Sequence, residues 1–540
     1  MDGRCFYNAR TILAVVLPLV AMAATPCHAQ GARCQELAKL VIPQAEITSA
    51  ADVNSGSFTP PQDPERKLPE PVASVPRFCR VQAVARPSSD SEIHFEVWLP
   101  QTWNGKLLGV GNGGYTGRIS YGALENGVAL GYATVSSDTG HTGSDLRFGA
   151  GHPEKIVDWG YRATHVTAED AKRILRAYYD RPEQHAYFNG CSTGGEQALQ
   201  EAQRFPQDYD GIVAGDPGND RIQLNAAFLW AHMATHPQGK SILDEAALQL
   251  LHHAVLEACD AADGVKDGVV GDPLRCRFDP AVLLCTNGRH EGCLSQAQME
   301  AARKVYQGPI NPHTGAKIMA GWEPGSELTA PGDYSGWRDY IVHGDEPARL
   351  DFWRYWVFDN PRWDWRSFDF DRDLAYAEKK LPAVNADSPD LRAFQARGGK
   401  LIVYHGWVDP VGPPRDSIDY FEKVTSLVGG RTSALEFFRL FLVPGMSHCN
   451  GGPGYLLAGG ARGVDDPEDV PKWPHPDPQH DVLSALDHWV QDSILPEQIL
   501  AFHTDPDGRK RTVPVCAYPK VAFPKDHPGD PAGQFHCVER

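Results

Sequence analysis

The chain has 540 residues, of which 42% are hydrophobic and 22% charged, so it can bury a sizeable core and has no long disordered segment. Its formal net charge of -18 argues against nucleic acid or an anionic membrane surface as a partner. This acidity is typical of a soluble exported protein.

The N-terminus has the features of a secretory signal peptide. Arg4 and Arg10 give it a basic start, and residues 12–24 form an apolar run that is too short to span a bilayer comfortably. Residues 25–29 make a suitable cleavage region. We therefore predict a signal peptide over residues 1–29, and a mature protein that is periplasmic or secreted.

Strands and helices alternate over residues 30–225, which predicts a mostly parallel sheet with helices on both faces. We interpret residues 31–85, which are rich in proline, as an irregular lead-in. The predicted strands cover residues 92–99, 106–110, 132–135, 186–188 and 211–215, and the predicted helices cover residues 167–179 and 196–204.

The alternation stops after about residue 225 and resumes near residue 396. Residues 396–540 hold predicted strands at 400–404 and 437–443 and a helix at 481–490. We therefore predict one α/β domain, built from residues 30–225 and 396–540, with an inserted lid domain over residues 226–395. The insertion has an aromatic patch that lines a substrate pocket or, as we favour, forms the core of the lid: Trp353, Trp356, Phe358, Trp363, Trp365 and Phe368.

Ten of the twelve cysteines follow the predicted signal peptide, and an even number in an exported protein indicates five disulfides. The sequence alone leaves the pairing open. Proximity along the chain favours Cys259 with Cys276, Cys285 with Cys293, and Cys516 with Cys537. Cys34 with Cys79 closes the N-terminal segment, and Cys191 and Cys449 remain.

Ser192 lies in Gly-Cys-Ser-Thr-Gly, a G-x-S-x-G pattern between a predicted strand and a predicted helix. Small residues permit the tight turn of a nucleophile elbow, and the helix directs its N-terminal amides at a developing oxyanion. The backbone amide of Thr193 and one from Gly113 or Gly114, which follow an early strand, are the predicted oxyanion donors. A plain glycine loop is the alternative for the last two.

An acid and a histidine follow Ser192 in the order that an α/β-hydrolase triad requires. Asp409 comes after the predicted strand at 400–404, and His448 after the strand at 437–443. Ser192 is then the nucleophile, His448 the general base and Asp409 the residue that orients it. His141 and His405 also lie near strand ends and would border the site, but we assign neither a catalytic role.

The segment from Asp260 to Val269 interleaves acids at 260, 263 and 267 with glycine. Three carboxylates with nearby carbonyls suit a hard cation such as Ca²⁺. The spacing is not that of an EF-hand, and a turn-rich solvated loop explains it equally well.

Gly-Cys-Ser-Thr-Gly-Gly at residues 190–195, together with Asp409 and His448-Cys449, resembles the tannase and feruloyl esterase family, which includes mono(2-hydroxyethyl) terephthalate hydrolase. The resemblance implies an α/β-hydrolase fold with a large lid and a disulfide that joins the cysteines beside the catalytic serine and histidine. It also implies a structural Ca²⁺ as the one cofactor, held by side chains of Asp260, Asp263 and Asp267 and carbonyls of Val265 and Val269.

The chain departs from this family after the elbow, where Asp216 and Asp220 stand among residues that are small and neutral in many relatives. This predicts added charge near the pocket.

We therefore expect a secreted carboxylic ester hydrolase that acts on a small-molecule aromatic ester of hydroxycinnamic or gallic type. The alternatives are an esterase for terephthalate monoesters or other small acyl esters, a serine peptidase on the same fold, and a secreted binding protein on a hydrolase scaffold.

Overall fold

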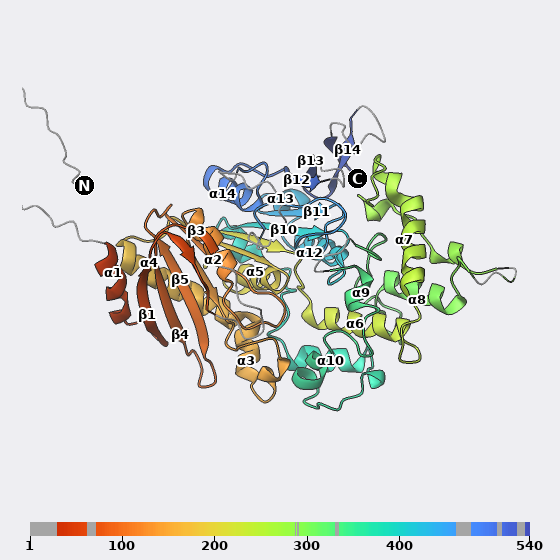
Figure 1. Cartoon of the computed structure of the whole chain (residues 1–540), viewed down its shortest axis with the longest axis horizontal. Coiled ribbons are helices and arrows are strands. Elements are labelled where there is room, and N and C mark those ends of the chain that lie inside the picture. Colours follow the sequence, from red (N-terminus) through yellow and green to blue (C-terminus); the bar gives the residue numbers. More distant parts are fainter. Residues whose placement is uncertain are drawn as a thin grey trace, which may run out of the picture.

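A nine-stranded mixed sheet forms the centre of the computed structural model, which describes residues 30–61, 72–286, 288, 291–329, 334–460, 477–504, 510–525 and 535–540 (Figure 1). The predicted signal peptide lies outside these residues. Within them, no helix is both long enough and apolar enough to cross a membrane.

The strands run from one edge of the sheet to the other in the order β1-β4-β5-β7-β6-β8-β9-β10-β11. The pairs from β1 to β7 are antiparallel, and those from β7 through β6 to β11 are parallel. The strands are β1 (Ala45–Val53), β4 (Phe78–Ala85), β5 (Ile93–Pro100), β6 (Lys106–Val110), β7 (Ala133–Ser137), β8 (His185–Cys191), β9 (Gly211–Gly215), β10 (Lys400–Gly406) and β11 (Phe438–Val443).

The prediction for residues 31–85 was wrong, because β1 and β4 are full members of the central sheet. β1 pairs with β4 from Ala45 to Val53, and β4 pairs with β5 along its whole length. Most of β1 is partly exposed, as is usual at a sheet edge, so its polar and small residues give no clear alternation.

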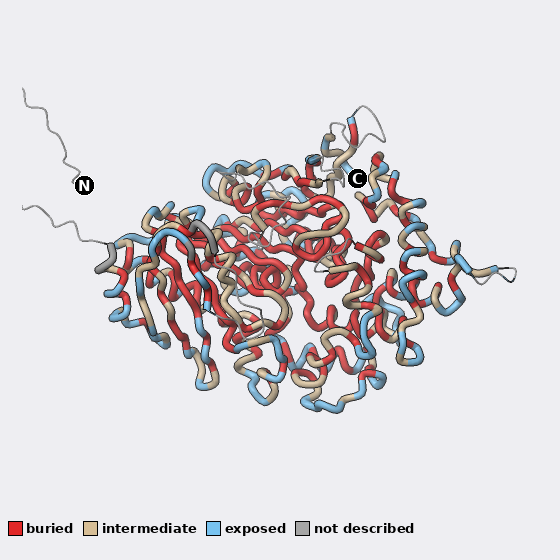
Figure 2. Tube along the Cα trace, in the orientation of Figure 1, coloured by how far each residue is buried: buried red, intermediate tan, exposed pale blue. Residues whose placement is uncertain are grey.

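Helices cover both faces of the sheet, as predicted. The apolar residues of α4 (Ala163–Tyr179), α5 (Thr193–Arg204) and α12 (Pro414–Leu427) share one buried cluster with the strands. Those of α2 (Tyr121–Ala129) and α14 (Val482–Asp492) share another with the opposite side chains of the strands. Figure 2 shows the buried residues concentrated in these layers.

Residues 216–399 form a long connection between β9 and β10, which are neighbours in the sheet. Their described part contributes no strand to the central sheet. Its helices are α6 (Arg221–Thr235), α7 (Glu245–Cys259), α8 (Gln296–Gln307), α9 (Trp337–Tyr340), α10 (Arg372–Lys380) and α11 (Arg392–Ala396). That this segment is a separate lid domain with limits at 226 and 395 stays a prediction.

The aromatic patch of this connection is largely core. Trp353 and Trp356 are 0% and 1% exposed, and they pack with Trp365 and Phe368 in one buried cluster. The patch therefore stabilises the connection rather than offering open aromatic surface.

Smaller elements complete the fold. β12 (Gln498–Thr504) pairs with β13 (Lys510–Cys516), and β14 (Lys520–Pro524) pairs with β15 (Phe535–Glu539). A third short pair joins β2 (Gly56–Phe58) and β3 (Val72–Val75). The remaining α-helices among the described residues are α1 (Gln30–Glu36), α3 (Pro153–Val157) and α13 (Arg431–Leu435).

Candidate active site

Ser192 occupies a sharp turn between β8 and α5, as the elbow pattern predicts. Its φ of 64° and ψ of -122° are strained for a residue with a side chain. A Cβ on Gly190 would overlap the Gly194 carbonyl, and one on Gly111 would lie 2.5 Å from the Gly194 Cα. Glycine is therefore required where the elbow touches the loop after β6.

The structure brings the three predicted triad residues into one hydrogen-bonded chain. His448 Nε2 lies 2.7 Å from Ser192 Oγ, and His448 Nδ1 lies 2.7 Å from Asp409 Oδ2. Asp409 is 0% and His448 2% exposed, whereas Ser192 is partly exposed. The serine is thus partly accessible to solvent while its two partners are shielded from water.

All five cysteine pairs favoured from the sequence are disulfides in the structure: Cys34–Cys79, Cys191–Cys449, Cys259–Cys276, Cys285–Cys293 and Cys516–Cys537. The second of these joins the residue before Ser192 to the residue after His448. The Cα atoms of Cys191 and Cys449 lie 5.9 Å apart. A covalent bond therefore holds the elbow against the histidine loop.

Asp409 is surrounded by hydrogen-bond donors. Its Oδ1 accepts from the backbone N–H groups of Val411 (2.6 Å) and Gly412 (3.1 Å). Burial opposes ionisation of Asp409, but the charge of His448 and hydrogen bonds from His405 and His448 outweigh it, so the pKa of Asp409 lies below its ordinary value. The carboxylate can therefore stabilise an imidazolium.

The predicted oxyanion donors lie at the mouth of the elbow. α5 begins at Thr193, so the first N–H groups of this helix have no partner within it. The loop that holds Gly113 and Gly114 follows β6 and touches the elbow through Gly111. A Cβ on Gly113 would meet no atom within 4 Å, so the space beside it is open. The oxyanion role of these residues stays a prediction.

Behind Thr193 lies a buried ion pair that the sequence analysis missed. Arg221 Nε donates to Glu196 Oε2 at 2.8 Å, and a second guanidinium nitrogen donates to Thr193 Oγ1 at 3.2 Å. The guanidinium also lies over the Tyr115 ring, 5.7 Å from its centroid. This contact holds the Thr193 side chain, which supports the orientation of the neighbouring amide.

Residues 334–349 contribute a tyrosine–arginine cluster beside the triad. Tyr334 stands edge-on to His448, with 5.2 Å between ring centroids, and its ring centroid lies 6.1 Å from that of Tyr340. Arg349 donates to the Tyr340 hydroxyl at 3.1 Å and lies 3.7 Å from a Cβ built on Gly114. These residues have no periodic pattern, so the sequence carried no signal for them.

The two acids after β9 are buried instead of exposed near a pocket. Asp216 is 2% exposed, and its Oδ1 accepts from the Gly406 N–H at 2.8 Å. Asp220 caps α6 by accepting from the Gln223 N–H at 3.0 Å. Both carboxylates therefore serve internal contacts.

The predicted calcium loop follows α7 and folds around its own carboxylates. Asp260 accepts from Gly268 N–H (3.1 Å), Asp263 from Val265 N–H (2.9 Å) and Asp267 from Val269 N–H (3.2 Å). Burial, and then the charges of Asp267 and Asp260, raise the pKa of Asp263 to about 7. A bound cation would relieve this repulsion.

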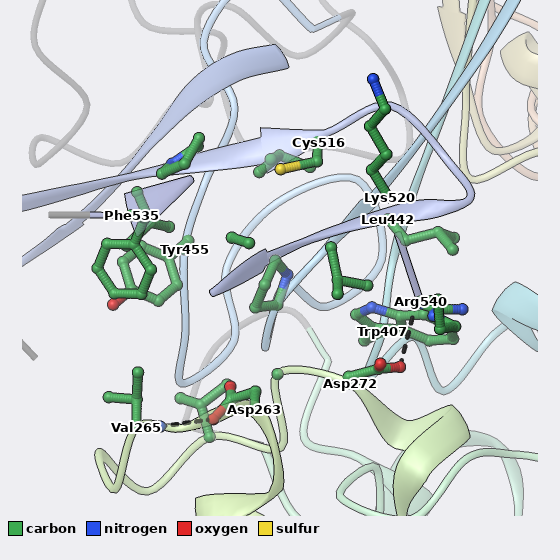
Figure 3. Close-up of a pocket in the computed structure, with 18 of the residues that line it drawn as sticks. Asp263, Val265, Asp272, Trp407, Leu442, Tyr455, Cys516, Lys520, Phe535 and Arg540 are labelled. Atoms are coloured by element: carbon green, nitrogen blue, oxygen red, sulfur yellow. Dashed lines mark hydrogen bonds and ion pairs between the residues drawn. The ribbon is translucent and has the colours of Figure 1, made fainter. Parts of the chain in front are cut away.

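This loop borders a cavity of about 50 Å³ under the C-terminal strands (Figure 3). Tyr455 lines the cavity near the loop, and its hydroxyl lies 3.4 Å from Asp267 Oδ2. A Cβ on Gly445 would meet Val269 at 2.8 Å, so the loop also touches the segment that leads to His448. The acidic loop therefore packs against the segment that leads to His448.

The fold is that of the α/β-hydrolases, and its nucleophile elbow, acid and histidine occupy the positions at which that class places a catalytic triad. The family model described as "Tannase and feruloyl esterase" matches residues 79–538. The chain belongs to this family and is a carboxylic ester hydrolase.

Individual relatives agree with this assignment. The chain is 39% identical to an "uncharacterized esterase" of Xanthomonas campestris pv. campestris, over 98% of this chain and 95% of that protein. It is 34% identical to a "probable feruloyl esterase B-2" of Aspergillus flavus, over 84% and 85%. The crystal structure of feruloyl esterase B from Aspergillus oryzae superposes with a TM-score of 0.85 at 28% identity, over 94% of this chain and all of that one.

Proposed function

We propose that the protein is an exported serine esterase that hydrolyses esters of hydroxycinnamic or gallic-type acids through an acyl-enzyme on Ser192. The observation that carries this proposal is the Ser192–His448–Asp409 chain, in which both contacts measure 2.7 Å. The disulfide beside it joins the turn that holds the nucleophile to the loop that holds the base. Membership of a family whose relatives are named feruloyl esterases supports the choice of acid.

In acylation, Ser192 Oγ attacks the acyl carbon of the ester while His448 Nε2 takes the hydroxyl proton. Asp409 accepts the Nδ1–H of the resulting imidazolium. The negative charge on the former carbonyl oxygen is held by the N–H of Thr193 and by an N–H of Gly113 or Gly114. The carbon–oxygen bond to the alcohol then breaks, and His448 gives its proton to the departing alkoxide.

Deacylation repeats these steps with water as the nucleophile. His448 takes a proton from the water as its oxygen attacks the acyl carbon, and the same amides hold the oxyanion. The bond to Ser192 Oγ then breaks, and His448 returns the proton to the serine. The free acid leaves, and the enzyme is regenerated.

A terephthalate monoester is a second candidate substrate because of Arg349. Among the described residues, no carboxylate lies within ion-pair distance of this guanidinium, which sits beside Gly114 and between the rings of Tyr115 and Tyr340. A substrate that carries a second, free carboxylate would supply that partner. The neutral phenolic ring of a hydroxycinnamate or gallate ester would instead contact the aromatic rings and the Tyr340 hydroxyl.

We also propose a structural Ca²⁺ in the loop after α7. The side chains of Asp260, Asp263 and Asp267 and the carbonyls of Val265 and Val269 would hold it, since carboxylate and carbonyl oxygens are the ligands that Ca²⁺ prefers. The ion would neutralise the clustered charges and stiffen the loop. The reaction itself needs only the triad and the backbone amides.

The disulfides support the proposal that the protein is exported. Five disulfides persist only in an oxidising compartment, which fits the predicted signal peptide and a periplasmic or secreted protein.

The direct test replaces Ser192 with alanine and measures hydrolysis of methyl ferulate. We expect the loss of nearly all turnover with an unchanged melting temperature, and Ser484→Ala on α14 serves as the matched control. Retained turnover would contradict the acyl-enzyme mechanism. A panel of ferulate, caffeate, gallate and terephthalate esters, compared by kcat/KM, then identifies the acid and decides the role of Arg349.

A further inference from the structure

A second histidine and a second carboxylate lie buried directly behind Asp409. His405, at the end of β10, is 0% exposed, and Asp216, after β9, is 2% exposed. His405 Nε2 lies 3.2 Å from Asp409 Oδ2 and 3.8 Å from Asp216 Oδ1. Asp409 Oδ2 therefore has an imidazole on each side, His448 at 2.7 Å and His405 at 3.2 Å.

The surroundings of His405 require a proton on Nε2. That nitrogen also lies 3.1 Å from the Gly412 carbonyl oxygen, so each group near it is an acceptor. Nδ1 lies 2.8 Å from Ser417 Oγ, which accepts when Nδ1 is protonated. Burial lowers the pKa of His405, but the hydrogen bond to Asp409 and the charges of Asp216 and Asp409 raise it above its ordinary value.

Histidine is the cation available to these carboxylates. Among the described residues, no lysine or arginine forms an ion pair with Asp216 or Asp409. Asp216 Oδ1 accepts from the Gly406 N–H, and its Oδ2 lies 3.4 Å from the Cys191 sulfur of the disulfide. Asp216 is thus held between the disulfide and the strand that leads to Asp409.

We propose that Asp216 and His405 form a charged positioning pair for the catalytic acid, resting on the proposed role of Ser192, His448 and Asp409. Protonated His405 donates Nε2–H toward Asp409 Oδ2 and fixes the carboxylate for His448. Asp216 balances the charge of His405. Neither residue touches the reacting atoms, so the pair acts through Asp409.

The other charged groups that face His405 are few. Asp416, on α12, lies close enough for its charge to interact with His405. His448 approaches from the loop after β11, through Asp409. Removing His405 therefore makes the surroundings of the triad more negative than in the parent, whereas removing the charge of Asp216 makes them less negative.

The test compares His405→Gln and Asp216→Asn by the pH profile of kcat/KM, whose acidic limb reports protonation of the general base. We expect His405→Gln to move that limb to higher pH by about one unit, because the remaining carboxylates favour a protonated base. Asp216→Asn should move it to lower pH, and the double variant should lie between the two. Both single variants should lower kcat and leave KM unchanged.

Asp170→Asn is the matched control, because this carboxylate is also buried but is paired with Arg173 on α4. It should not move the limb. An unmoved limb in both variants, shifts of the same sign, or a KM effect without a kcat effect would overturn the proposal. Melting temperatures check folding, and Asp216→Asn carries the test alone if His405→Gln does not fold, because it keeps the acceptor for Gly406.

These outcomes are distinct from a failure of the proposed function. The profiles are measured only on hydrolysis that Ser192→Ala abolishes. If hydrolysis survives Ser192→Ala, the triad assignment fails; if it is abolished and the limbs do not move, only the positioning pair fails.

Discussion

Removing the disulfide between Cys191 and Cys449 should cost both stability and activity. The bond closes a loop across a sequence separation of 258 residues, whereas Cys285–Cys293 spans only 8. By the chain-entropy relation, the long loop is worth at most about 5.5 kcal/mol in the free energy of unfolding, and the short one about 2.5 kcal/mol. The double variants Cys191→Ala/Cys449→Ala and Cys285→Ala/Cys293→Ala therefore form a matched pair.

Activity separates the two variants more sharply than stability does. The first bond lies beside Ser192 and His448, so its loss lets the two loops drift from their 2.7 Å contact. A misplacement of about 1 Å at a reacting centre costs on the order of 100-fold in rate. We therefore expect kcat to fall by 10- to 100-fold in this variant, and to stay near that of the parent in the other.

The assay pairs denaturant unfolding, followed by tryptophan fluorescence, with initial rates on a chromogenic ester at a temperature where both variants are folded. Full kcat in folded Cys191→Ala/Cys449→Ala protein would refute the positioning argument, even if stability falls. Mass spectrometry that finds Cys191 and Cys449 as free thiols in the parent would refute the pairing itself.

Two further predictions concern the calcium loop and a buried cap. Chelation should lower the melting temperature by a few degrees, because a ligand at 100 times its Kd adds about 2.7 kcal/mol to the free energy of unfolding. Asp267→Asn should melt at the temperature of the chelated parent and should not respond to chelator. Equal melting temperatures of the parent with and without chelator would contradict the calcium site. Burial raises the pKa of Asp220 to about 8, so its contribution is present below pH 4 and is lost as the pH rises through about 8. The free energy of unfolding should therefore fall from pH 4 to 8, and less steeply in Asp220→Asn.

The parallel half of the sheet could be predicted because its strands are short apolar runs followed by glycine or polar turns. β6 and β9 have the predicted bounds, and Ser192, Asp409 and His448 each follow a predicted strand. Chain order therefore predicted three residues that the structure joins in one hydrogen-bonded chain. β1 and β4 escaped because neither shows a clear alternation: most of β1 is partly exposed at the sheet edge, and β4 is buried along most of its length.

The walls of the site could not be predicted, because loops within residues 216–399 supply them. Tyr334 and Arg349 reach the site from irregular segments around α9, and Tyr334 packs against a buried cluster that includes residues of α6, α7 and α8. Asp216 stood out in the sequence as a charge where small neutral residues were expected. The positioning role that we propose for it depends, however, on its contact with His405. That contact joins residues from two different strand ends, which only the sheet order brings together.

The sheet order also explains why a covalent bond stands at this site. Ser192 follows β8 and His448 follows β11, with β9 and β10 between them. Strands lie about 4.8 Å apart, so the two ends are about 14 Å apart, and the histidine loop must fold back across the intervening strands.

Two features allow that crossing. A side chain at Gly406 would overlap the Met446 carbonyl, so the last residue of β10 must be a glycine where the loop passes over it. The Val408 N–H donates to Met446 O at 3.1 Å and ties the loop to the segment after β10 that carries Asp409. At the far end of the crossing, the disulfide joins the residue after His448 to the residue before Ser192.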